Sequence, residues 1–146
     1  MDLSNYKIEL VKIAKNAGDA IMDIYKNEAD FGVETKGDDS PLTKADKAAN
    51  DVICEGLLKM APEIPIISEE NKLTDYAERK NYDYCWLVDP LDGTKEFIKR
   101  NGEFTVNIAL LKDGQPVLGV VYAPVPDEMY WGEKGKGAYL LSLIHI

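Results

Sequence analysis

Residues 86–97, which read WLVDPLDGTKEF, are the stretch from which the fold of this chain can be worked out. An apolar run ends here and is followed by Pro90, which lacks the N–H that a further rung of a sheet ladder needs. We therefore expect a buried strand to stop at this proline. Asp89 and Asp92 would then face a loop at the end of the strand.

This loop has the side chains of a site for a divalent metal ion and a phosphate. Asp89 and Asp92 offer the oxygen ligands that Mg²⁺ prefers, and the carbonyl of Leu91 between them is a third oxygen donor. Gly93 stands where the backbone needs a conformation, or a closeness to a ligand, that a Cβ would prevent. The N–H groups of Gly93 and Thr94 can point into the same hollow. The structural alternative is a type I turn, because Asp-Pro and Asp-Gly are common turn formers.

Three separated motifs occur in the order in which a known family carries them. They are TKAD at 43–46, SEE at 68–70 and WLVDPLDGT at 86–94. Together they resemble the inositol monophosphatase-like family of metal-dependent, lithium-sensitive phosphatases. The continuation KEF at 95–97 is more similar to the 3′(2′),5′-bisphosphate nucleotidase (CysQ-type) branch than to the inositol phosphatases. The resemblance runs from near the N-terminus to about Tyr139.

The resemblance implies an α+β fold, the N-terminal domain of the layered sugar-phosphatase architecture, with two helices packed on a mainly antiparallel sheet. The apolar pattern agrees with it. Apolar residues recur at helical spacing over residues 3–26 and again over 43–60. Runs rich in β-branched residues, separated by turns, predict an antiparallel meander at 104–111, 117–122 and 129–132.

We expect residues 1–140 to form one metal- and phosphate-binding domain and residues 141–146 to be a truncated or foreign tail. The single histidine, His145, lies in this tail, so we do not expect it to be a catalytic base. Family members continue into a second α/β domain that supplies another metal-binding aspartate and much of the substrate pocket. The resemblance therefore identifies the chain as an N-terminal part.

Composition excludes some functions. A net charge of −9 argues against binding to a nucleic-acid backbone, which needs many lysines and arginines. Cys54 and Cys85 have no metal-ligand spacing, and we expect two reduced, packed thiols.

The chain shows neither a signal-peptide core nor an apolar run that could span a bilayer. A cytoplasmic protein fits best, and peripheral association with the inner face of the membrane is compatible with it; the oligomeric state is left open.

The resemblance also implies roles for individual residues. Two or three Mg²⁺ ions would be bound by four oxygen donors: Glu69, Asp89, the Leu91 carbonyl and Asp92. Substrate would be held by the same loop: Glu69, Leu91, Asp92, Gly93 and Thr94. Asp46 would orient the Thr94 hydroxyl so that the pair activates an attacking water, which Glu69 also contacts. Lys36 and Asp39 would lie in a loop close to the metals.

Asp46 has a structural alternative. If Thr43 caps a helix that starts there, Asp46 is an acid in the first turn, where the helix dipole favours negative charge. The two roles are compatible, because one carboxylate oxygen can accept from the backbone and the other from Thr94.

The function implied for the complete protein is the removal of the 3′-phosphate from adenosine 3′,5′-bisphosphate, giving AMP and phosphate, within sulfur assimilation. Two alternatives stay open. One is an inositol monophosphatase or another sugar phosphatase, since a three-residue signature at 95–97 decides substrate weakly and a fold does not decide it. The other is a non-catalytic fragment that binds metal or phosphate and hydrolyses nothing.

Overall fold

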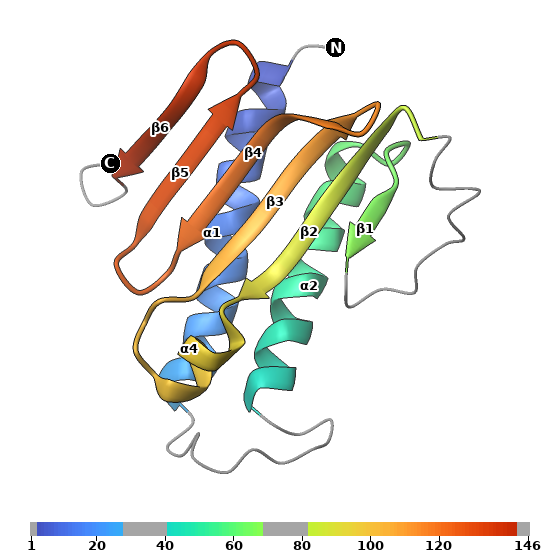
Figure 1. Ribbon diagram of the computed structural model, residues 1–146. Coiled ribbons are helices and arrows are strands. Elements are labelled where there is room, and N and C mark those ends of the chain that lie inside the picture. Colours follow the sequence, from blue (N-terminus) through green and yellow to red (C-terminus); the bar gives the residue numbers. More distant parts are fainter. Residues whose placement is uncertain (1–2, 28–40, 69–81, 143–146) are drawn as a thin grey trace.

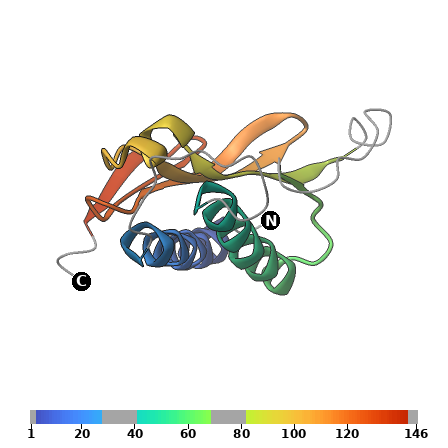
Figure 2. The ribbon, with the colours of Figure 1, turned by 90° about the horizontal axis from the view of Figure 1, so that it is seen from below.

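A computed structural model describes residues 3–27, 41–68 and 82–142 of the chain (Figure 1). Two long helices, α1 (Leu3–Asn27) and α2 (Pro41–Met60), lie side by side on one face of a sheet (Figure 2). A short helix, α4 (Thr94–Lys99), directly follows the second strand. The six strands that the described residues form are, in sheet order, β1 (Ile66–Ser68), β2 (Tyr84–Asp92), β3 (Thr105–Lys112), β4 (Gln115–Ala123), β5 (Glu128–Glu133) and β6 (Gly137–Ser142).

The sheet is antiparallel except at one edge. β1 pairs with β2 in parallel, and every later pair from β2 to β6 is antiparallel. This arrangement confirms the expected α+β class and its mainly antiparallel sheet. Because parallel strands end at the same edge of a sheet, Ser68 at the end of β1 lies opposite Val88 near the end of β2. β6 runs to Ser142, and the domain boundary expected at residue 140 stays a prediction.

Two expected boundaries were wrong. β2 does not stop at Pro90 but continues to Asp92, with an irregular register between Asp89 and Asp92. A proline is tolerated at such a bulge, because the extra residue makes no ladder hydrogen bond. α2 begins at Pro41, a position that suits proline because the first N–H groups of a helix have no partner within it. Thr43 is therefore inside the helix rather than at its cap.

The core lies between the sheet and the two long helices. α1 contacts β3 and β4, and α2 contacts β2. Gly18 allows α1 to approach β4 closely, because a Cβ at this position would lie 2.3 Å from Cε2 of the buried Tyr122. The largest fully buried side chains are those of Trp86, Tyr122, Phe97, Phe104, Leu10, Ile21, Ile53, Leu57, Ile108, Leu110, Leu118 and Met129.

Both cysteines have free thiols, as the sequence predicted. Cys54 is half-buried in α2, and Cys85 is buried in β2, where burial raises the pKa of its thiol. Among the helices that the structure describes, none combines the length and the hydropathy needed to cross a bilayer.

Tyr122 connects the core to the turn after β4, and its ionisation leads to a prediction for alkaline pH. Its hydroxyl donates a hydrogen bond of 2.5 Å to Oδ1 of Asp127, which also lies 3.8 Å from Nζ of Lys15. Burial, and then this hydrogen bond, raise the pKa of Tyr122 from 10.0 to about 12, against a lowering effect of Lys15. The native state therefore keeps the phenol proton at pH values at which the unfolded chain has lost it.

We expect the free energy of unfolding to fall more steeply with pH in the parent protein than in Tyr122→Phe, over the window from about 10 to about 12. The free energy of unfolding falls, rather than rises, because the unfolded state binds fewer protons than the native state in this window. Urea unfolding at a series of pH values measures both slopes. Tyr139→Phe is the matched control, because Tyr139 is an exposed tyrosine of the same sheet. Equal slopes for Tyr122→Phe and the parent would contradict the prediction.

Candidate active site

A bulge in β2 brings the two predicted acid ligands to one face of the sheet. On a regular strand the side chains alternate, so residues three apart point to opposite faces. Asp89 lies opposite Asn107, however, and Asp92 lies opposite Thr105. Three steps along β2 therefore correspond to two steps along β3, and the extra residue returns Asp92 to the side of Asp89. The bulge supports the joint use of these two carboxylates as ligands.

The facing strand presents polar groups to this acid pair. Nδ2 of Asn107 donates a hydrogen bond of 3.0 Å to Oγ1 of Thr105, and both residues are part-buried. Thr105 was expected to be a sheet residue, which is confirmed, but its place opposite Asp92 depends on the register and was not predicted. Asp89 and Asn107 also line a groove of about 460 Å³ on the sheet face that points away from α1 and α2.

Gly93 adopts the unusual backbone conformation that the sequence led us to expect. Its φ of 101° and ψ of 53° are left-handed, and the residue forms the N-cap of α4. A Cβ here would lie 3.2 Å from the carbonyl oxygen of Glu103 and 3.2 Å from Cα of Phe104. The carbonyl of Gly93 accepts the N–H of Phe97 at 2.9 Å, which starts the helix. The strand therefore turns into α4 within one residue, immediately after Asp92.

We expect Gly93→Ala to lower the free energy of unfolding by about 2 to 4 kcal/mol, since a left-handed alanine is strained and its Cβ also meets backbone atoms that cannot move aside. Gly114→Ala is the matched control, because Gly114 has a φ of 79° and open space around it. Gly114→Ala should lower the free energy of unfolding by about 1 kcal/mol, from backbone strain alone. Urea unfolding of the two variants measures the difference, and equal losses would contradict it.

α4 was missed by the sequence analysis, which treated residues 94–99 as part of a loop. Its signals were present, because Glu96 lies in its first turn and Lys99 in its last turn, as the helix dipole favours. The helix is too short for its apolar period to be visible. Phe97 is the buried residue of this helix.

An aromatic cluster holds α4 in place. The ring of Phe97 lies 5.6 Å from Tyr25 at the end of α1 and 5.3 Å from Phe104, which precedes β3. Arg100, at the C-cap of α4, donates a hydrogen bond of 2.8 Å to the carbonyl of Tyr25. Two other segments, the end of α1 and the residue before β3, therefore fix the orientation of α4, and with it the start of the helix at Thr94.

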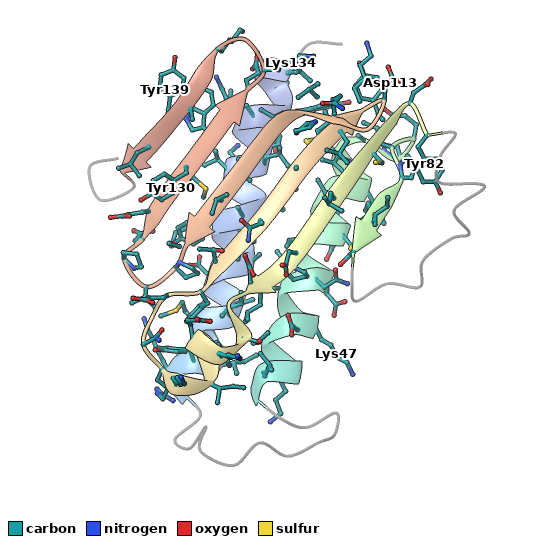
Figure 3. The ribbon with its side chains drawn as sticks, viewed as in Figure 1. Lys47, Tyr82, Asp113, Tyr130, Lys134 and Tyr139 are labelled. Atoms are coloured by element: carbon teal, nitrogen blue, oxygen red, sulfur yellow. The ribbon has the colours of Figure 1, made fainter. Side chains whose placement is uncertain are left out.

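Asp46 lies on α2, beyond its first turn, which contains no acid. The expected dipole interaction with the helix start is therefore wrong, because that interaction weakens within the first turn. Asp46 is half-buried, and α2 contacts both β2 and α4. Its neighbour Lys47 lies at the end of the molecule where α4 is found, whereas Asp113 lies at the opposite end (Figure 3). The structure thus places Asp46 and Thr94 on two contacting helices.

Several predicted residues lie outside the described part of the chain. These are Lys36, Asp39 and Glu69, and Glu70 of the SEE motif lies there too. Within residues 3–27, 41–68 and 82–142, no group of three His, Cys, Asp or Glu residues could hold a metal ion. The donors that are described fit Mg²⁺ in kind, because Asp89, Asp92 and the Leu91 carbonyl offer oxygen atoms only. Glu69 directly follows Ser68, which is paired with Val88, the residue before Asp89.

The sequence is also similar to known proteins. A relative from Salmonella typhimurium (strain LT2), a 3′(2′),5′-bisphosphate nucleotidase CysQ, is 56% identical over 128 residues, which are 88% of this chain and 52% of the relative. The protein of the same name from Escherichia coli (strain K12) is 53% identical over 128 residues, with the same coverage. The chain thus spans about half the length of the relatives that it matches.

Solved structures share the fold. The crystal structure of CysQ from Bacteroides thetaiotaomicron matches 97% of this chain with a TM-score of 0.86 and 46% identity, and 51% of that protein is covered. An inositol monophosphatase from Anabaena matches 96% of this chain with a TM-score of 0.77 and 30% identity, covering 48% of that protein. The model of the inositol monophosphatase family matches residues 2–145. The chain therefore belongs to the inositol monophosphatase family.

Proposed function

We propose that the whole protein is a Mg²⁺-dependent 3′(2′),5′-bisphosphate nucleotidase that converts adenosine 3′,5′-bisphosphate to AMP and phosphate. The observation that carries the proposal is the junction of β2 and α4. There a bulge aligns Asp89 with Asp92, and a left-handed Gly93 starts a helix in the next residue. The choice of substrate is supported by the relatives, which carry the nucleotidase name at 37% to 56% identity.

In this proposal the metal ligands are Glu69, Asp89, the Leu91 carbonyl and Asp92, and two or three ions are bound. Mg²⁺, when bound, neutralises charge on the phosphoryl oxygens and on the leaving oxygen. The free site carries several negative charges on neighbouring carboxylates, and the repulsion between them disfavours the native state until a cation is bound. We therefore propose that metal binding also stabilises the native state.

The other groups of the site bind the phosphate and move a proton. N–H groups at the start of α4, from Gly93 and Thr94, donate to a phosphoryl oxygen, because the first N–H groups of a helix have no partner within it. Asp46 accepts from the Thr94 hydroxyl and orients it, so that the pair takes a proton from the attacking water. The water oxygen bonds to phosphorus, the bond from phosphorus to the 3′ oxygen breaks, and this oxygen gains a proton.

The test is a comparison of phosphate release from adenosine 3′,5′-bisphosphate and from inositol 1-phosphate by the full-length protein with Mg²⁺. We expect kcat/KM to favour the nucleotide by at least about tenfold, which corresponds to about 1.4 kcal/mol. A preference for inositol 1-phosphate would contradict the nucleotidase activity and support an inositol monophosphatase activity instead. No hydrolysis of either substrate would refute both activities.

The 146-residue chain by itself is a separate question, because it spans about half of its relatives. We propose that it binds metal without turnover. Calorimetric titration with Mg²⁺, run beside a phosphate-release assay, should show a binding isotherm and no released phosphate. Measurable turnover would contradict this proposal. A cytoplasmic location stays a prediction of the sequence.

A further inference from the structure

Two polar side chains are buried in the interface between α2 and the sheet, and they bond to each other. Asn50 is 6% exposed and Ser68 is 1% exposed, and they are the only polar residues classed as buried in the described part of the chain. Oγ of Ser68 donates a hydrogen bond of 2.7 Å to Oδ1 of Asn50. The neighbouring buried residues of the helix are apolar: Ala45, Ala49, Ile53 and Leu57.

This hydrogen bond joins the segments that carry the proposed site. Asn50 lies four residues after Asp46, so the two side chains are on the same side of α2, one turn apart. Ser68 is the last residue of β1 and lies opposite Val88, which precedes Asp89. The bond therefore ties the turn of α2 next to Asp46 to the strand ends next to Asp89.

The energetics of the pair indicate that it positions α2 on the sheet rather than adding much to the free energy of unfolding. A buried hydrogen bond contributes little net free energy, and two apolar side chains of similar shape can replace both partners at little cost. Breaking this bond inside a buried interface is costly, however, and this cost favours the position of α2 in which Ser68 and Asn50 meet.

We propose that Asn50 and Ser68 are positioning residues, whose hydrogen bond fixes α2 against the ends of β1 and β2 and so sets the place of Asp46 relative to Asp89. The expected effect on catalysis rests on the proposed function. The effect on metal binding rests on the proposed ligands but not on the proposed hydrolysis, because it depends on the end of β1 keeping its place beside Asp89.

The test uses three variants of the full-length protein: Ser68→Ala, Asn50→Leu and the double variant. Thermal unfolding, calorimetric Mg²⁺ titration and kcat at saturating Mg²⁺ are measured for each. Both single variants should melt at lower temperature, because each removes the hydrogen bond between Ser68 and Asn50 from a buried interface. The double variant should recover most of the melting temperature, because two apolar side chains then replace the buried polar pair. All three should bind Mg²⁺ about tenfold or more weakly, as for other groups that hold metal ligands in place, and kcat should fall with them.

Cys54→Ala is the matched control, because Sγ of Cys54 lies 3.6 Å from the same Oδ1 of Asn50 and the variant leaves the bond from Ser68 intact. Its Mg²⁺ affinity and kcat should stay within about twofold of the parent.

A double variant with parental melting temperature and parental Mg²⁺ affinity would overturn the proposal, since the pair would then be a replaceable part of the core. Failure of the proposed function would be seen in a different measurement: the parent protein would bind Mg²⁺ but would not hydrolyse the bisphosphate. In that case the Mg²⁺ affinities of the variants still decide whether the pair positions the site.

Discussion

Asp89→Asn should lower kcat/KM of the full-length protein for adenosine 3′,5′-bisphosphate by more than about a hundredfold. Even the outer partners of metal ligands change affinity or activity by about 10- to 100-fold, and Asp89 is proposed as a direct ligand. Asparagine has nearly the same shape, so the bulge opposite Asn107 can persist while the negative charge is lost. The effect is then one of metal binding rather than of folding.

Asp83→Asn is the matched control, because Asp83 is exposed just before the other end of the same strand. It undergoes the same change of charge and should keep parental activity. Mg²⁺ should raise the melting temperature of the parent and of Asp83→Asn, and raise that of Asp89→Asn much less, since a bound ligand stabilises only the state that binds it. Parental activity and a parental Mg²⁺ response in Asp89→Asn would remove this residue from the ligand set.

Asp46→Asn should lower kcat by about 10² to 10⁴, the range for groups that assist proton transfer, while the melting temperature changes little. The structure sharpens this expectation. Had Asp46 belonged to the first turn of α2, the loss of its charge would also have weakened the helix. Since α2 begins at Pro41 and its first turn contains no acid, that contribution is small.

Asp51→Asn provides the control, because Asp51 is exposed on the same helix and undergoes the same change. Thr94→Ala should reproduce the loss caused by Asp46→Asn, and the double variant should be little worse than either single one, since residues that act as a unit are not additive. A large fall in melting temperature with modest loss of kcat would instead make Asp46 a structural residue. Additive losses for Asp46 and Thr94 would show that the two act separately.

Much of the fold was predictable because it follows from local periodicity. The helical spacing of apolar residues over residues 3–26 predicted α1 to within one residue at its C-terminal end. The turns between the runs at 104–111, 117–122 and 129–132 predicted where β3, β4 and β5 are separated. The predicted elements are found in the tertiary structure because the apolar residues that define each period are also the residues that are buried.

The candidate site was predictable in composition but not in geometry. The sequence, with the family resemblance, identified Asp89, Asp92, Gly93 and Thr94 as neighbours, yet it placed both acids in a loop. The structure continues the strand through Pro90 and uses an irregular register to bring the acids to one face. No local pattern predicts this, because a bulge is defined by the partner strand. Glu69 and its role stay predictions, since it lies outside the described residues.

The order of the acidic and glycine motifs and the helical and strand periods were determined by the sequence alone, because each depends on residues close together in the chain. Only the tertiary structure decided that Ser68 bonds to Asn50, that Asp92 returns to the side of Asp89, and that α4 is held by Tyr25 and Phe104. These features join segments far apart in the sequence. Their geometry is set by packing and sheet register, to which every residue of the core contributes.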